Sequence, residues 1–149
     1  MQPYTGYIKD DVNFKVLFEN FVMLVGNVFE AAYCYNKLTK EEMGIFRFTN
    51  DPTCAVVGKN NDWVLIGGDQ LVLKTWIDKT LRILDAENIH DFKIIDAYTV
   101  NILTDPWAKD AAIWQLQIDL TRLTRPIALI KVKDFKDYFE KPYTDEVIW

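Results

Sequence analysis

The first third of the chain carries apolar residues at the spacing of a helix. Eight of them recur three or four positions apart between residues 11 and 36: Phe14, Leu17, Phe18, Phe21, Leu24, Val25, Val28 and Ala32. Asp10 or Asp11 would cap the start of such a helix. Further apolar residues widen the arc: Val16, Val22, Met23 and Phe29. The pattern predicts a long helix over 11–36 that is buried on several sides, beneath a sheet or against another subunit.

The pattern changes to short strands from Ile45 onwards. Apolar runs at 45–49, 54–59, 63–66 and 71–76 are separated by three turn-forming segments, Asn50-Asp51-Pro52, Asn60-Asn61-Asp62 and Gly67-Gly68-Asp69. This alternation predicts an antiparallel meander. Because residues 63–66 are all apolar, we expect a central strand that is covered on both faces.

The second half mixes both patterns. Ile77, Leu81 and Leu84 predict a short amphipathic helix near 77–86, whereas residues 92–103, 114–120 and 127–132 read as strands. Asp134 would cap a last short helix over 134–140. An alternative remains for residues 105–125, because Asp105-Pro106 is a good helix start; period two at 114–120 favours a strand there.

Together these elements predict an α+β fold. A long N-terminal helix would pack on a mainly antiparallel sheet of about six or seven strands, without the βαβ alternation that gives parallel sheets. No repeat, low-complexity tract or linker divides the 149 residues, so we expect a single domain over 1–149.

The cysteines and the apolar runs bear on localisation. Two cysteines are too few for a disulfide scaffold, and the polar first ten residues do not resemble a signal peptide. The longest apolar run, 21–25, is far shorter than the roughly 20 residues that cross a bilayer. We therefore expect a cytoplasmic protein that does not enter the membrane.

Charge is unevenly distributed. The net charge is −5, which argues against nucleic-acid binding as the main activity. Residues 1–121 carry 11 positive and 17 negative side chains, whereas residues 122–141 carry six positive and three negative ones. An acidic body of this kind suits a basic protein partner, and the 14% of aromatic residues would supply anchors for binding.

The side chains that most catalytic sites need are scarce. The chain has no serine and one histidine, His90, and its cysteines, Cys34 and Cys54, lie in apolar segments that predict buried thiols. Three Cys and His residues at scattered positions have no zinc spacing, and Gly67-Gly68-Asp69 lacks the spacing of a phosphate loop. No catalytic, cofactor-binding or metal-binding residue is therefore assigned, and no cofactor is expected.

One segment resembles a known group of proteins. Residues 61–73 combine a Trp-led strand, a Gly-rich turn and a second apolar strand, and in a small acidic chain this is similar to immunity proteins of bacterial polymorphic toxin systems. The resemblance implies a cytoplasmic inhibitor that binds and neutralises a cognate toxin, possessing no chemistry of its own. No site residue is carried over from it.

Three functional hypotheses follow. The first is a non-enzymatic protein-binding module, most concretely an immunity protein that binds a basic toxin domain. The second is a small-molecule-binding protein or enzyme that uses dispersed carboxylates in a pocket between the sheet and the first helix. The third is a homo-oligomer with a structural or accessory role, associating through helix 11–36.

Overall fold

The protein is built almost entirely of strands. The computed structural model describes residues 6–77, 79–120, 127–143 and 146–149, and within them the chain forms twelve strands and one short 3₁₀ helix, η1 (Ile8–Asp10). The first sheet contains β1 (Phe14–Glu19), β2 (Met23–Val28), β3 (Ala31–Asn36) and β4 (Glu42–Arg47). The second contains β5 (Cys54–Val57), β6 (Trp63–Gly67), β7 (Leu71–Thr75) and β8 (Thr80–Leu84). The third contains β9 (Ile89–Asp96), β10 (Thr99–Thr104), β11 (Ala112–Ile118) and β12 (Ile127–Asp134).

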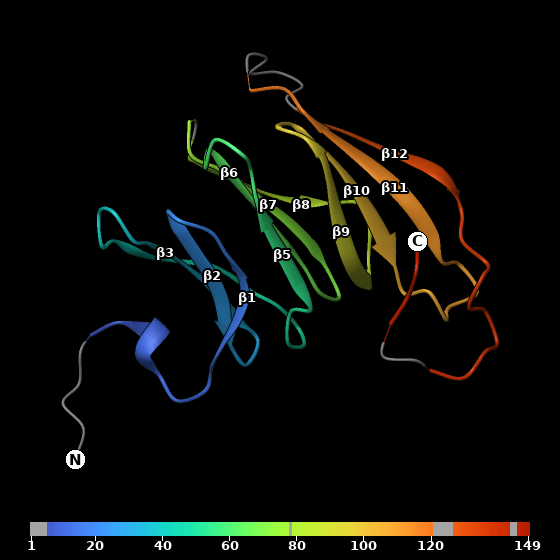
Figure 1. Cartoon of the computed structure of the whole chain (residues 1–149), viewed down its shortest axis with the longest axis horizontal. Coiled ribbons are helices and arrows are strands. Elements are labelled where there is room, and N and C mark those ends of the chain that lie inside the picture. Colours follow the sequence, from blue (N-terminus) through green and yellow to red (C-terminus); the bar gives the residue numbers. More distant parts are fainter. Residues whose placement is uncertain (1–5, 78, 121–126, 144–145) are drawn as a thin grey trace.

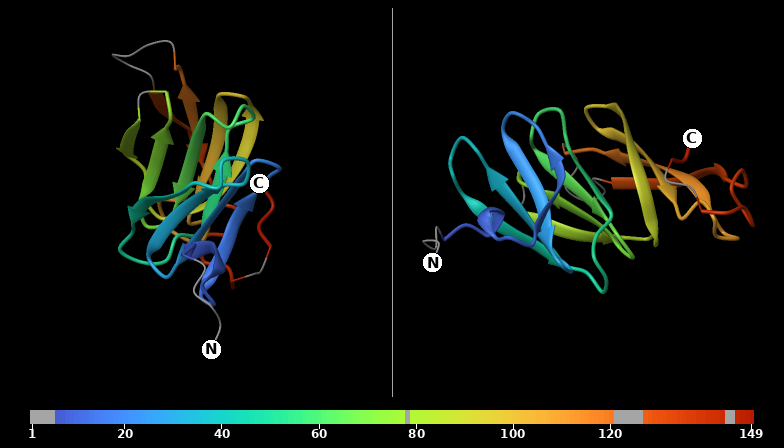
Figure 2. Two further views of the ribbon diagram at one scale, coloured as in Figure 1. Left: turned by 90° about the vertical axis from the view of Figure 1, so that its left-hand side faces the viewer. Right: turned by 60° about the horizontal axis from the view of Figure 1, so that its bottom comes forward.

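Each sheet is an antiparallel meander of four consecutive strands. The sheets stand side by side like a fan: β5 contacts both β1 and β9, while the last strand of each sheet forms an outer edge (Figures 1 and 2). Four-stranded sheets arranged about their first strands are the blades of a β-propeller. The fold is therefore propeller-like, with the three sheets as blades 1, 2 and 3, and the predicted α+β class is wrong.

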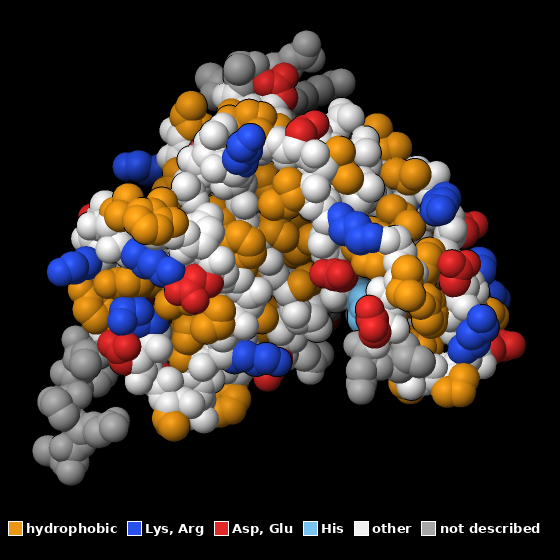
Figure 3. Space-filling view, viewed as in Figure 1, with side chains coloured by type: hydrophobic (Ala, Val, Ile, Leu, Met, Phe, Trp, Pro, Cys, Tyr) orange, Lys and Arg blue, Asp and Glu red, His pale blue; other side chains and the backbone are white. Residues whose placement is uncertain are grey.

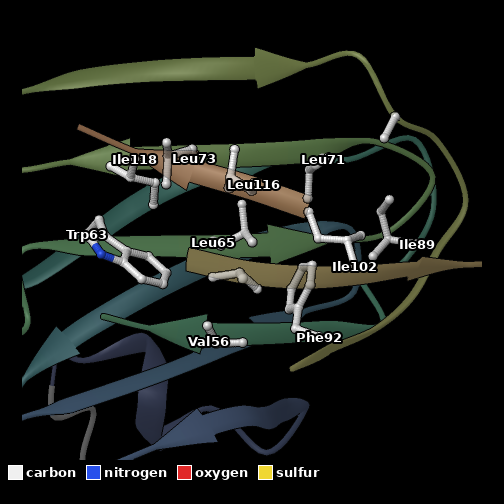
Figure 4. Packing of buried hydrophobic residues seen from close by; sticks show 12 residues of the cluster. Val56, Trp63, Leu65, Leu71, Leu73, Ile89, Phe92, Ile102, Leu116 and Ile118 are labelled. Atoms are coloured by element: carbon white, nitrogen blue, oxygen red, sulfur yellow. The ribbon is translucent and has the colours of Figure 1, made fainter. Parts of the chain in front are cut away.

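Two apolar cores hold the blades together. One lies between blades 1 and 2 and includes Val25, Cys34, Val64 and Ile66. The other lies between blades 2 and 3, where Trp63 and several leucines and isoleucines interlock (Figure 4). Every residue of β6 is buried, because neighbouring residues of a strand point to opposite faces and blade 2 is covered on both.

The helix predicted over 11–36 is absent, and β1, β2 and β3 occupy its place. Apolar residues recur at helical spacing there because both faces of the sheet carry them. Val25 points into the core, whereas its neighbour Leu24 lies on the opposite face, across from Tyr35. A tight turn at Phe29, whose φ is 50°, reverses the chain in the middle of the predicted helix.

The two short helices are also wrong. Strand β8 occupies half of 77–86, and residue 78 of that range lies outside the described part. Lys79 has a φ of 54°, which no right-handed helix accommodates. Asp134 ends β12 instead of capping a helix over 134–140. Turns follow it, with a backbone hydrogen bond from Phe139 N to Lys136 O of 3.3 Å.

The strand predictions fare better. The Gly-rich segment forms the turn of the β6–β7 hairpin, and 63–66 is a central strand covered on both faces, as predicted. Residues 92–103 are extended as predicted but form two strands, because the chain turns at Ala97 and Tyr98. Strand β11 confirms period two at 114–118; residues 121–125 of the alternative helix lie outside the described part.

Candidate functional site

A hollow opens at one end of blades 2 and 3. It consists of two adjoining cavities of about 310 and 290 Å³ that share Asn88 and Asp105. Its walls are alternate connections of the meanders: the loops before β5, before β9 and after β10, and the β6–β7 turn. In Figure 3 the lower edge of the molecule is notched between the parts formed by these two blades, with acidic side chains beside the notch. We call this hollow the acidic groove.

Hydrogen bonds between the four connections fix the groove. The Thr53 hydroxyl donates to the carbonyl of Ile89 at 2.7 Å, and Ile89 N donates to Gly68 O at 2.7 Å. Asp105 N donates to Asn88 O at 2.8 Å, and the Asp105 carboxylate in turn accepts from Trp107 N at 3.1 Å. These hydrogen bonds join the connections to one another, so the side chains that line the groove are held in place before a ligand binds.

The groove gathers negative charge. Six carboxylates line it: Asp51, Asp69, Asp85, Glu87, Asp105 and Asp110. No Lys or Arg belongs to the described lining, so the carboxylates sum to a negative potential in a concave site, where low-dielectric walls strengthen the field. Oδ1 of Asp69 is buried and has no hydrogen-bond partner among the described residues, so it can accept a bond from a ligand's N–H or O–H group.

Aromatic residues flank the acidic groove. His90, the one histidine of the chain, lies at the start of β9 and lines the groove. Its ring stands edge-on to Trp107, with the ring centroids 5.6 Å apart, and Tyr143 packs against the other side of the cluster, 4.8 Å from Trp107. The groove thus combines negative charge with two aromatic lining residues, His90 and Trp114, and such a combination accommodates cationic side chains.

The structure does not activate either cysteine. Cys34 lies in the core between blades 1 and 2, and burial raises its pKa to about 12. Cys54 begins β5, one residue from the groove, and burial likewise raises its pKa to about 12. A nucleophilic cysteine needs the opposite shift, so neither thiol is activated. Cys34 is buried, as the sequence predicted, whereas Cys54 is half-buried.

This burial predicts slow thiol labelling. A pKa of about 12 leaves roughly a thousandfold less thiolate at pH 8 than an ordinary cysteine has. We expect native Cys34 and Cys54 to react with Ellman's reagent at least a hundredfold more slowly than in urea. Rapid labelling of the native protein, with unchanged circular dichroism, would contradict the burial of the two thiols.

A third cavity, of about 350 Å³, lies where blades 1 and 2 meet and is lined by Met23, Cys34, Met43, Trp76 and polar neighbours that include Glu41 and Glu42. The described residues contain no group of three or more His, Cys, Asp or Glu side chains that could hold a metal ion. No pocket between a sheet and a first helix exists, because that helix is absent.

The comparisons with known proteins found a similarity of backbone fold and none of sequence. No family model matches the chain, and no curated protein matches its sequence. Among solved structures it is similar to the N-terminal domain of Nup159 and to a chain of an S. cerevisiae complex of Dbp5 bound to Nup159, Gle1, IP6 and ADP. Both have a TM-score of 0.47 and 16% identity over 78% of this chain. The chain spans only 29% of their length.

One finding bears on the membrane. In the described part of the chain, no helix combines the length and the apolar character needed to cross a bilayer.

Proposed function

We propose that this chain is a non-enzymatic protein-binding module whose acidic groove receives a basic segment of a partner protein. The observation that carries the proposal is the lining of the groove: six carboxylates and no Lys or Arg among its described residues. Such a surface attracts Lys and Arg side chains from a distance and orients them on contact. The unpartnered Oδ1 of Asp69 offers an acceptor for one of them.

The size and rigidity of the groove fit this role. Two adjoining cavities of about 300 Å³ each accommodate extended side chains in succession. The walls are connections on a rigid scaffold of strands, which is where binding residues concentrate in proteins. The Trp107 cluster at the margin supplies aromatic area for the apolar stems of Lys or Arg.

Removing negative charges from the acidic groove tests the proposal. The triple variant Asp85→Asn, Glu87→Gln, Asp110→Asn should bind a fluorescein-labelled Lys/Arg-rich peptide at least tenfold more weakly than the wild type, measured by fluorescence anisotropy. Binding by the wild type should weaken as salt is added, because screening shortens the reach of the charges.

A matched variant separates local contact from net charge. Asp11→Asn, Asp137→Asn, Glu140→Gln removes the same three charges from residues outside the groove lining. It should bind the peptide within twofold of the wild type. Equal losses in both triple variants would show a general charge effect and overturn the proposal.

An immunity protein that neutralises a basic toxin domain would be one such module, and this is the form suggested by the resemblance of residues 61–73. Such a protein would form a complex with the product of the adjacent gene, and it would protect cells that co-express the two. The absence of both the complex and the protection would count against the immunity-protein form. Peptide binding in the acidic groove would still be decided by the fluorescence-anisotropy experiment.

A further inference from the structure

The central blade shows how a blade of this protein is stabilised. Val64 and Ile66 of β6 face blade 1, Leu65 faces blade 3, and all three have no exposed surface. A blade in this fold thus has an apolar sheet packed on either face. Blades 1 and 3 each have such a neighbour on one face only.

The second face of blade 1, which we call the outer face of blade 1, is rich in apolar and aromatic side chains. The residues alternate with those that point into the core: Phe14, Val16, Leu24, Gly26, Val28, Tyr33 and Tyr35. Val16 is 52% exposed. The Phe14 ring lies so close over Gly26 that a Cβ there would come within 2.3 Å of it, so this glycine keeps the face flat.

The outer face of blade 3 has a complementary character. Its residues again alternate with those of the core and include Thr99, Asn101, Gln115, Gln117, Ala128 and Ile130, together with Lys93, Leu103, Ile113 and Lys133 toward one end. Three amides form a chain in which Gln117 donates to Gln115 at 3.3 Å and Gln115 donates to Asn101 at 3.2 Å. Ile130 beside them is 60% exposed.

The ends of the chain cover these faces only in part. Tyr7 packs edge-on against Tyr35, with ring centroids 5.2 Å apart, at one margin of blade 1. Trp149 packs with Leu103 and Ile113 at one margin of blade 3, where Lys93 lies 4.5 Å above its ring. Val16 and Ile130 stay exposed on the uncovered parts.

We infer that a second copy of this chain covers both faces. The outer face of blade 1 of each copy packs on the outer face of blade 3 of the other, which closes a ring of six blades with twofold symmetry. Three blades per copy give six in a dimer, within the range of four to eight that propellers typically have, whereas three copies would give nine. Closed twofold dimers are the commonest oligomers.

The chemistry and the area of the faces suit this occupant. Aromatic rings of blade 1 would lie against the amide chain of blade 3, whose remaining donors and acceptors can bond to the tyrosine hydroxyls. A sheet of four six-residue strands measures about 20 by 19 Å, or about 400 Å² per face. Four whole faces sum to about 1,600 Å², the size of a stable protein interface, and the parts that Tyr7 and Trp149 already cover reduce this area.

The mass of the full chain in solution tests the inference. Light scattering coupled to gel filtration at micromolar concentration should give twice the chain mass of 17.4 kDa. Val16→Lys places a charge in the proposed interface and should weaken dimerisation at least tenfold. Ile83→Lys, at a residue of β8 that is also 60% exposed but lies on neither outer face, should remain dimeric.

A monomeric mass for the wild type throughout this concentration range would overturn the inference, as would a trimer or a Val16→Lys variant as dimeric as the wild type.

A cross-link distinguishes the ring from other dimers. A short bismaleimide should join Val16→Cys copies to Ile130→Cys copies in a mixture, above the background of the unmodified chain. Cross-linking of Val16→Cys alone, or none in the mixture, would contradict the ring. Peptide binding in the acidic groove is measured separately and is unaffected by either result.

Discussion

Trp63→Ala is expected to lower the free energy of unfolding by about 3–5 kcal/mol, the usual cost of removing a large buried aromatic side chain. Trp63 has no exposed surface, and its indole N–H donates to Ala97 O of the β9–β10 turn at 3.1 Å. Gly58 lies against the ring, where a Cβ would come within 2.5 Å of Nε1. The substitution therefore removes packing and a hydrogen bond that joins blade 2 to blade 3.

Urea unfolding followed by far-ultraviolet circular dichroism measures this effect. Phe21→Ala is the control, because Phe21 is 86% exposed and its loss should change the free energy of unfolding by less than about 0.5 kcal/mol. If the two variants were equally stable, Trp63 could not occupy the core between the blades.

Val64→Asp is expected to lower the free energy of unfolding by several kcal/mol at neutral pH and by less in mild acid. Val64 has no exposed surface and lies in the core between blades 1 and 2. An unpaired carboxylate there costs several kcal/mol, a large part of the 5–15 kcal/mol that stabilises a typical domain. Burial raises the pKa of such a carboxyl above its unfolded value of about 3.9. The folded state then binds more protons, so stability is retained below pH 4 and lost as the pH rises through the folded pKa.

Val64→Asn is the matched variant, because its amide has a similar size and does not titrate. We expect the difference in free energy of unfolding between the Asp and Asn variants to grow from pH 4 to pH 7, measured by urea unfolding at each pH. A difference that did not change with pH would mean that residue 64 is accessible to water, against the two-sided burial of β6.

Strands β5, β6 and β7 of blade 2 could be predicted from sequence, whereas β1, β2 and β3 of blade 1 could not. Around Gly67 and Gly68 short apolar runs end at obvious turn residues, so local pattern and fold agree. In 14–36 both faces of the sheet carry apolar residues, and a continuous apolar segment has no period that separates strand from helix. Gly26 and Asn20 were the available signals: glycine weakens a helix, and Asn20 forms a turn by accepting from Val22 N at 2.8 Å.

The acidic groove shows a different limit of sequence reasoning. Asp51 and Asp69 were recognised in turn-forming segments and Asp105 at a candidate helix start, yet nothing placed them together. In an antiparallel meander every second connection lies at the same end, so a correct strand count would have gathered them. Because the wrong helices at 11–36 and 77–86 altered that count, the groove could not be foreseen.

The arrangement of the two cores determines how the free energy of unfolding is distributed among the three blades. Blades 1 and 3 meet blade 2 through separate cores, and Phe18 near the convergence of the first strands is a residue that packs against both. The molecule thus behaves as a short linear array in which each unit is coupled to its nearest neighbour. Within a single copy of the chain, the free energy of opening either end blade includes one interface term, whereas opening the middle blade includes two. Cooperativity is therefore transmitted through β6 and β7, and an end unit can open while the remaining pair stays folded.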